Sequence, residues 1–215
     1  MAGEAPEPDR KARAARRTRD RLAAAALALA LDRGLAAVTV EEIAARADVT
    51  RRTFSRHFTG KESAVVDCLR ADADRINRAL RARPAGEPPL TAYHRAVRDW
   101  LADPDAPAWH RRPRVFDLLR LAEQEPTLFA ALQHTRVDAQ EDAVRILADR
   151  LGTDPDTDLR PAVLVGACAG ALIAAQTAWV RGGDTGALPR LVDEAFAALT
   201  AERAAARAAE RGGSP

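Results

Sequence analysis

The fold is decided by residues 39–65, which read TVEEIAARADVTRRTFSRHFTGKESAV. Within this stretch Glu42 follows Thr39 by three residues, which is the spacing of a capping box at the start of a helix. Thr50 also has the side chain of a helix cap, and a second short helix is predicted over residues 51–57. The stretch therefore predicts two short helices joined by a tight turn.

The second of these helices is almost free of apolar side chains. Its one apolar residue is Phe54, which suits an anchor to neighbouring helices, and no acidic residue occurs between Thr50 and Lys61. Guanidinium and hydroxyl groups donate hydrogen bonds to base edges and phosphates. The pattern predicts a helix-turn-helix whose second helix enters the major groove of DNA. The candidate contacts on it are Thr50, Arg51, Arg52, Thr53, Ser55, Arg56 and His57.

Apolar residues recur every three or four positions along the rest of the chain, and this spacing predicts helices. The first covers about residues 13–33 and ends at Gly34, and a long helix begins at residue 61. About nine helices and no strand are predicted, in an all-α fold. We expect an N-terminal three-helix unit over residues 13–60, a larger helical domain over 61–207, and disordered ends at 1–12 and 208–215.

The formal net charge of +2 is unevenly distributed along the chain. Residues 10–61 hold 13 basic side chains against five acidic ones, a net charge of +8, whereas the remainder carries −6. A basic segment on an acidic body indicates an anionic partner, such as double-stranded DNA, for that segment alone. Cys68 and Cys168 lie far apart without a paired-cysteine motif, which is typical of reduced thiols in a cytoplasmic protein.

Residues 161–180 hold no charged side chain and have a glycine spacing that is typical of a closely packed helix. Gly166 and Gly170 have the four-residue spacing that lets two helices approach each other. The length would also allow a membrane span, so a membrane-attached regulator is one alternative. The segment is rich in alanine and glycine and includes Gln176, so burial in a core or subunit interface, with no membrane partner, is the favoured interpretation.

The stretch 39–65 closely resembles the DNA-binding signature of TetR-family transcriptional regulators, and with the preceding helix the resemblance covers about residues 13–70. It implies a helix-turn-helix domain followed by a helical ligand-binding and dimerisation domain, whose last two helices pair across a homodimer. Those helices would be 159–182 and 186–205. The interface residues expected on them are Gly166, Gly170, Leu188, Val192 and Phe196.

The resemblance also implies roles position by position. Thr39, His57 and Lys61 match phosphate contacts. Two positions depart from the family pattern: Asp48 replaces the usual glycine of the turn, and Ser55 replaces an aromatic residue that binds phosphate. Arg56 or Arg52 would bind that phosphate in place of the aromatic residue. The positions that usually read bases are Thr50, Arg51, Arg52 and Thr53.

The C-terminal part is similar in outline to mycofactocin-type regulators of actinobacteria, which sense long acyl-CoA esters. This similarity implies a repressor that a small apolar or acyl-type effector releases from a palindromic operator. A constitutive regulator without an effector and an activator are the alternatives. No catalytic, metal or cofactor motif occurs, so an enzyme is not expected. The expected lining of the effector cavity is Trp100, Phe116, Arg120, Phe129, His134, Gln176 and Trp179.

Overall fold

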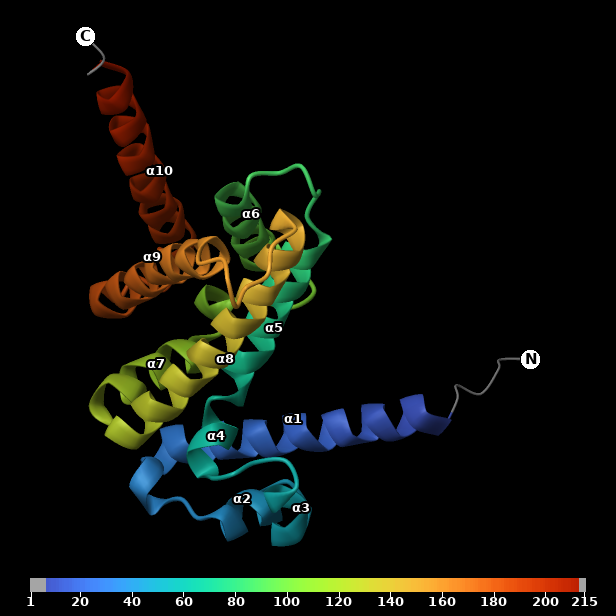
Figure 1. Cartoon of the computed structure of the whole chain (residues 1–215). Coiled ribbons are helices and arrows are strands. Elements are labelled where there is room, and N and C mark those ends of the chain that lie inside the picture. The colour runs from blue at the N-terminus through green and yellow to red at the C-terminus, as the bar shows by residue number, and fades with distance from the viewer. Residues whose placement is uncertain (1–6, 213–215) are drawn as a thin grey trace. The chain divides into compact units, whose positions relative to one another are not determined.

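The computed structural model describes residues 7–212, and within this range the chain forms helices and no strand (Figure 1). The all-α fold class is thereby confirmed. Ten α-helices and two short 3₁₀ helices follow one another along the described chain. In order they are α1 (Glu7–Arg33), η1 (Leu35–Ala37), α2 (Val40–Arg46), α3 (Arg51–Ser55), α4 (Lys61–Val65), α5 (Asp67–Ala82), α6 (Pro89–Ala102), η2 (Trp109–Arg111), α7 (Pro113–Gln124), α8 (Pro126–Leu151), α9 (Arg160–Gly182) and α10 (Leu188–Gly212).

The tenth helix arises where one long helix was predicted from residue 61. The chain divides there into α4 and α5 at Val66, which ends α4. Val65 and Val66 are adjacent β-branched residues and both are buried, and such side chains favour a helix less than straight ones do. Residues 7–12 and 208–212, predicted to be disordered, lie within α1 and α10, while 1–6 and 213–215 lie outside the described residues.

The helices divide into two units, each described here by itself. The N-terminal unit consists of the described residues up to Ala71 together with Arg120–Thr135, and the C-terminal unit of Asp72–Leu119 together with the described residues from Arg136. The domain boundaries predicted from the sequence, 13–60 and 61–207, stay a prediction.

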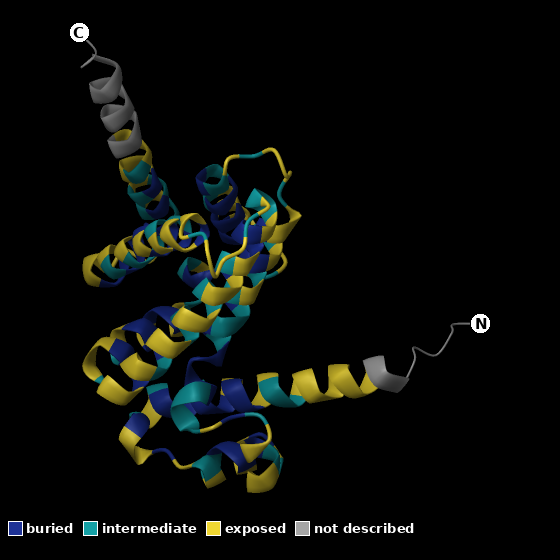
Figure 2. Ribbon diagram, viewed as in Figure 1, coloured by how far each residue is buried: buried dark blue, intermediate teal, exposed yellow. Residues whose placement is uncertain are grey.

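The core of the N-terminal unit is built from one face of each of its first helices. Leu22 and Leu29 of α1 are buried with Ile43 of α2, Phe54 of α3 and Val65 of α4 (Figure 2). Each is at most 8% exposed. Because burial of apolar area is the main stabilising contribution to such a small unit, these side chains hold the short helices α2 and α3 in place.

Arg19 of α1 links three separate segments of the N-terminal unit. Its guanidinium donates to the buried carboxylate of Asp67 at 2.8 Å and to the main-chain oxygen of His57 at 2.9 Å. It also lies 4.5 Å from the ring centroid of Phe58. A planar guanidinium suits this combination of a paired carboxylate and an aromatic face, so Arg19 fixes the chain that follows α3 against α1.

Asp72 is the central polar group of the C-terminal unit and is 2% exposed. Its carboxylate accepts hydrogen bonds from the indoles of Trp109 at 2.9 Å and Trp100 at 3.2 Å. It also accepts from Arg75 at 3.2 Å and from Arg112. A buried carboxylate is stable only where such donors surround it, so the five side chains form one network linking α5, α6, η2 and the start of α7.

Candidate DNA-binding site

α2 is held in place by reciprocal hydrogen bonds at its first turn. The Thr39 hydroxyl accepts from the main-chain N–H of Glu42 at 3.2 Å, and the Glu42 carboxylate accepts from the main-chain N–H of Thr39 at 2.9 Å. The capping box predicted here is therefore present. Arg33 donates to the same carboxylate at 2.9 Å, and with the Thr39 hydrogen bonds it lowers the pKa of Glu42 to about 2. Glu42 is ionised throughout the physiological range.

The turn between α2 and α3 passes through Asp48, whose φ is 53°. Among the described residues it is the one residue other than glycine with positive φ. This explains why the family pattern has glycine here, since a residue without Cβ adopts that conformation without strain. Aspartate is one of the few other residues that tolerate it. Asp48 therefore adopts the positive φ that a glycine would adopt at this position.

α3 begins at a threonine cap and is anchored by one side chain. The Thr50 hydroxyl accepts from the main-chain N–H of Thr53 at 3.1 Å, which is the cap that the sequence predicted. Phe54 is 2% exposed and packs on Phe58 with ring centroids 5.5 Å apart. The Ser55 hydroxyl donates to the main-chain oxygen of Arg51 at 3.2 Å. The helix thus buries one face through Phe54 alone and exposes the others.

The candidate base-reading side chains lie on that exposed surface. Arg51, Arg52 and Arg56 are exposed, and Thr53 is partly exposed. Arg51 pairs with Glu41 of α2 at 2.8 Å, but both side chains are more than half exposed, so solvent screens the pair and it is easily exchanged for a base or phosphate. The arrangement can therefore present several forked donors to a DNA groove.

Lys61, which the family resemblance implies is a phosphate contact, forms hydrogen bonds within its own chain. Its ammonium donates to the main-chain oxygens of Leu35 at 2.8 Å and Val38 at 2.9 Å. Two of its three donors are thus used to tie α4 to the segment that leads into Thr39. The sequence does not reveal this role, because the two acceptors are main-chain groups more than twenty residues away.

The residues expected to line an effector cavity fall into separate groups. Phe116 and Trp179 meet edge to face with ring centroids 5.0 Å apart, and Gln176 lies one turn before Trp179 on α9. Gln176 is 6% exposed and accepts a hydrogen bond from Arg136 at 3.0 Å. Burial lowers the pKa of Arg136. These four side chains join α7, α8 and α9.

The other expected lining residues lie elsewhere. Trp100 packs edge to face on Trp109 and belongs to the Asp72 network. Arg120, Phe129 and His134 are exposed and belong to the N-terminal unit. Arg136 was missed because a basic residue in an amphipathic helix pattern is normally a surface residue.

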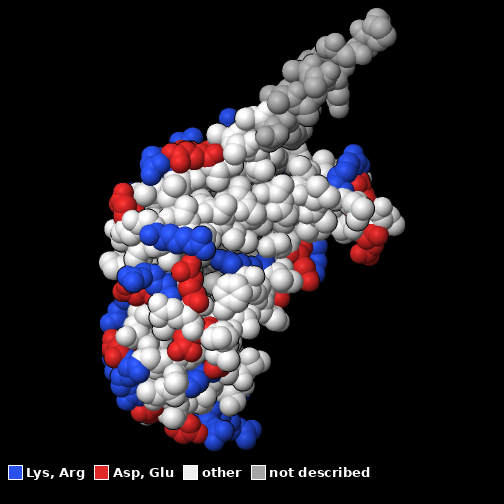
Figure 3. All heavy atoms as spheres, turned by 90° about the vertical axis from the view of Figure 1, so that its left-hand side faces the viewer, with Lys and Arg blue, Asp and Glu red and all other residues white. Residues whose placement is uncertain are grey.

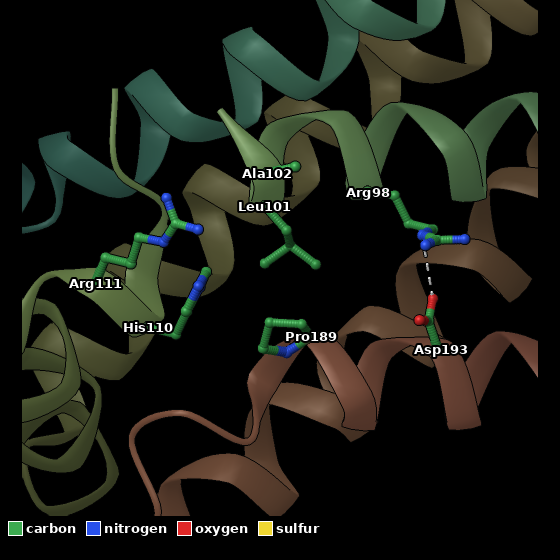
Figure 4. Close-up of a pocket in the computed structure, with 7 residues that line it drawn as sticks. All are labelled: Arg98, Leu101, Ala102, His110, Arg111, Pro189 and Asp193. Atoms are coloured by element: carbon green, nitrogen blue, oxygen red, sulfur yellow. Dashed lines mark ion pairs between the residues drawn. The ribbon is translucent and has the colours of Figure 1, made fainter. Parts of the chain in front are cut away.

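A pocket of about 230 Å³ lies elsewhere in the C-terminal unit, between α6, η2 and α10 (Figure 4). Leu101 and Pro189 form its apolar part, with His110 on one side and the Arg98–Asp193 ion pair, at 3.6 Å, on the other. Burial and the nearby Arg111 guanidinium lower the pKa of His110, so the imidazole is neutral near pH 7. The volume is below the roughly 300–1,000 Å³ typical of ligand pockets.

The residues expected at a dimer interface also divide into two groups. Gly166 and Gly170 are exposed on α9, and a methyl group built on either would meet nothing within 4 Å. Leu188, Val192 and Phe196, in contrast, are at most 1% exposed and lie in the core of their own unit, where Phe196 stacks on His94 at 4.5 Å. The apolar stripe of α10 is therefore used largely within one chain.

α9 is long and apolar enough to cross a membrane, and 44% of its most apolar window is buried inside the protein. Leu159, at 76% exposed, precedes α9, and Val163, at 65%, lies on its first turns. α9 extends toward the left-hand side of Figure 1, and Figure 3, which views the protein from that side, shows a broad uncharged area there. One face of α9 thus packs on its own unit and the opposite face is apolar and uncovered.

Two protein-family models match the chain. The model of bacterial regulatory proteins of the tetR family matches residues 22–65, and the model of the MftR C-terminal domain matches residues 87–204. A curated relative, the HTH-type transcriptional regulator TcmR of Streptomyces glaucescens, is 37% identical over 165 residues, which cover 74% of this chain and 71% of TcmR.

Solved structures share the fold. SmeT of Stenotrophomonas maltophilia, in complex with triclosan, is similar over 84% of this chain and 90% of its own, with a TM-score of 0.56 and 19% identity. A TetR-family regulator from Syntrophomonas wolfei is similar over 86% and 95% of the two chains, with a TM-score of 0.58 and 15% identity. Given the two family models and the 37% identical relative, the chain belongs to the TetR family of DNA-binding transcriptional regulators.

Proposed function

We propose that the chain is a homodimeric, ligand-responsive repressor that places α3 of each copy in successive major grooves of a palindromic operator. The observation that carries this proposal is the surface of α3, where exposed arginines surround a single buried anchor, Phe54. Half-sites one helical turn apart have centres separated by roughly 34 Å. Within each copy, residues 13–60 would bind the DNA and residues 61–207 would dimerise and bind the effector, in the cytoplasm.

The homodimer would form through the uncovered face of α9. A glycine inside a helix costs about 0.5–1 kcal/mol relative to alanine, yet a side chain at Gly166 or Gly170 would meet nothing within the single chain. The absence of side chains at both glycines would allow the α9 helix of a second copy to approach the α9 backbone closely. The exposed Leu159 and Val163 extend the same apolar surface. This use of α9 also accounts for its uncharged composition without a membrane.

Filling these two positions with leucine is expected to disrupt the dimer. The Gly166→Leu, Gly170→Leu chain should dimerise at least about 100-fold more weakly, because overpacking costs about 1–3 kcal/mol at each site. Sedimentation velocity measures the dissociation constant. Selection of bound DNA from a random pool should return a palindrome for the native chain and at most a weak half-site for the variant. Ala130→Leu, at an exposed position of α8, is the control.

Two results would count against the proposal. If the variant remains dimeric, α9 does not form the dimer interface. If the native protein selects no DNA motif, it does not bind an operator.

The effector site is proposed among Phe116, Arg136, Gln176 and Trp179. Apolar rings beside a half-buried guanidinium and a buried amide suit a ligand with an apolar chain and an anionic or polar head. Insertion would separate the Arg136–Gln176 hydrogen bond and move α8 relative to α9. The pocket at His110 is too small for an acyl-CoA, so we do not propose it as the effector site.

A thermal-shift measurement with myristic acid and myristoyl-CoA tests this site. A bound ligand at 100 times its dissociation constant should stabilise the native protein by about 2.7 kcal/mol, which raises the melting temperature by several degrees. Arg136→Met should abolish the shift, whereas Arg120→Met, on an exposed residue, should keep it. If Arg136→Met still shows the increase in melting temperature, the ligand binds at another site. If the native chain shows no increase with either ligand, acyl chains are not the effector class.

A further inference from the structure

The first turns of α1 extend beyond the rest of the helix-turn-helix. Every residue from Arg10 to Arg17 is exposed, and the first residue after them that is buried is Leu22 (Figures 1 and 2). The TetR-family model also begins only at Leu22. Since residues 10–17 bury no side chain against their own unit, packing does not explain why they are present.

Their side chains are strongly basic. Between residues 10 and 21 there are seven basic side chains and one acidic one, Asp20. Arg10, Arg13, Arg17 and Arg21 follow one another at spacings of three and four residues, which places them in one stripe along the helix. A stripe of like charges on an exposed helix face is an attractive surface for a polyanion.

The stripe ends beside the turn that precedes α3. Arg21 donates to the main-chain oxygen of Ala47 and lies 3.9 Å from the carboxylate of Asp48. From Arg21 to Arg10 the helix rises about 16 Å at 1.5 Å per residue. This length matches about five base-pair steps at 3.4 Å each. DNA that meets the first residues of α3 can thus continue along the stripe.

We infer that Arg10, Arg13 and Arg17 form a second DNA contact, which binds phosphates beside the base pairs that α3 reads. The contact is independent of sequence, since guanidinium groups pair with phosphate and not with base edges there. Arg19, in the same turns, has a different task, because it is committed to Asp67 and Phe58. The small side chains between the arginines give no apolar face for membrane insertion, so DNA is the polyanion that fits.

The test compares the native full-length chain with the triple variant Arg10→Gln, Arg13→Gln, Arg17→Gln by fluorescence anisotropy. The probes are the operator recovered by selection and a scrambled duplex of equal length. At 0.1 M salt the variant should bind both duplexes at least about tenfold more weakly, in nearly the same ratio. The slope of log affinity against log salt should fall by about 0.9 for each phosphate that is no longer bound, or about 3 for one copy.

A matched control removes the same charge from the C-terminal unit: Arg78→Gln, Arg81→Gln, Arg145→Gln, all at exposed positions. If the stripe variant and this control have the same affinity and salt slope, the inference is wrong. It is also wrong if the stripe variant loses binding to vesicles of anionic lipid but not to DNA. The inference rests on the proposed operator binding. If operator binding itself fails, the native chain selects no DNA motif. This result differs from failure of the inference, in which the native chain selects a motif but the stripe variant binds it as tightly as the control does.

Circular dichroism separates weaker phosphate binding from a disrupted fold. The stripe variant should unfold at nearly the same denaturant concentration as the native chain, because the three substituted side chains are exposed. A loss of affinity that accompanied a lower unfolding midpoint would contradict the inference.

Discussion

Replacing Asp72 by alanine is expected to lower the free energy of unfolding of the C-terminal unit by about 3–5 kcal/mol. The carboxylate is 2% exposed, and its loss leaves the indole N–H groups of Trp100 and Trp109 without an acceptor. It also removes the carboxylate that pairs with Arg112 in a partly buried site, while Arg75 keeps its second carboxylate partner, Asp103, at 2.7 Å. Urea unfolding followed by tryptophan fluorescence measures the change.

Two control substitutions test whether the loss of stability depends on the burial of the Asp72 carboxylate. Asp99→Ala removes a carboxylate that is 60% exposed and paired with Arg83, and should change stability by no more than about 0.5 kcal/mol. Asp72→Asn keeps the shape and one acceptor, so we expect an intermediate loss. Equal effects of Asp72→Ala and Asp99→Ala would show that the network contributes nothing.

Replacing Phe54 by alanine should destabilise the helix-turn-helix by about 3–5 kcal/mol and abolish operator binding. Phe54 is the one apolar residue of α3, and it is 2% exposed. A five-residue helix has no stability of its own in water, so its position depends on this anchor. Chemical denaturation together with fluorescence anisotropy on the operator measures both effects.

Phe129→Ala is the control in the same unit. This ring is 45% exposed on α8, so its removal should cost far less and leave operator binding intact. Sedimentation should find both variants dimeric, because α9 is untouched. A Phe54→Ala chain that still bound its operator with native affinity would mean that α3 does not read the DNA.

Much of the DNA-binding unit could be predicted because its signals are local. The caps Thr39 and Thr50 and the positive φ at Asp48 depend on a few neighbouring residues. Each such signal specifies a hydrogen bond or a backbone conformation within one turn of chain. The helix count failed only at Val66, where two adjacent valines interrupt an otherwise regular pattern.

The long-range polar contacts could not be predicted. Arg19 and Asp67 are 48 residues apart, and Asp72 collects donors from 3 to 40 residues away. In sequence, each of these residues is one more charge on an amphipathic helix. The spacing of Leu188 and Val192 predicted an apolar face correctly, but periodicity does not say whether that face packs within one chain or against another.

The turn at Asp48 has a consequence for how this regulator can evolve. Its side chain is 99% exposed, so only the backbone conformation constrains the position. A single base change converts an aspartate codon into one for asparagine or glycine, and both residues accept a positive φ. A single base change to valine, which is β-branched, would strain the turn. Position 48 can therefore change among these three residues while the turn keeps the backbone conformation that holds α3 in place.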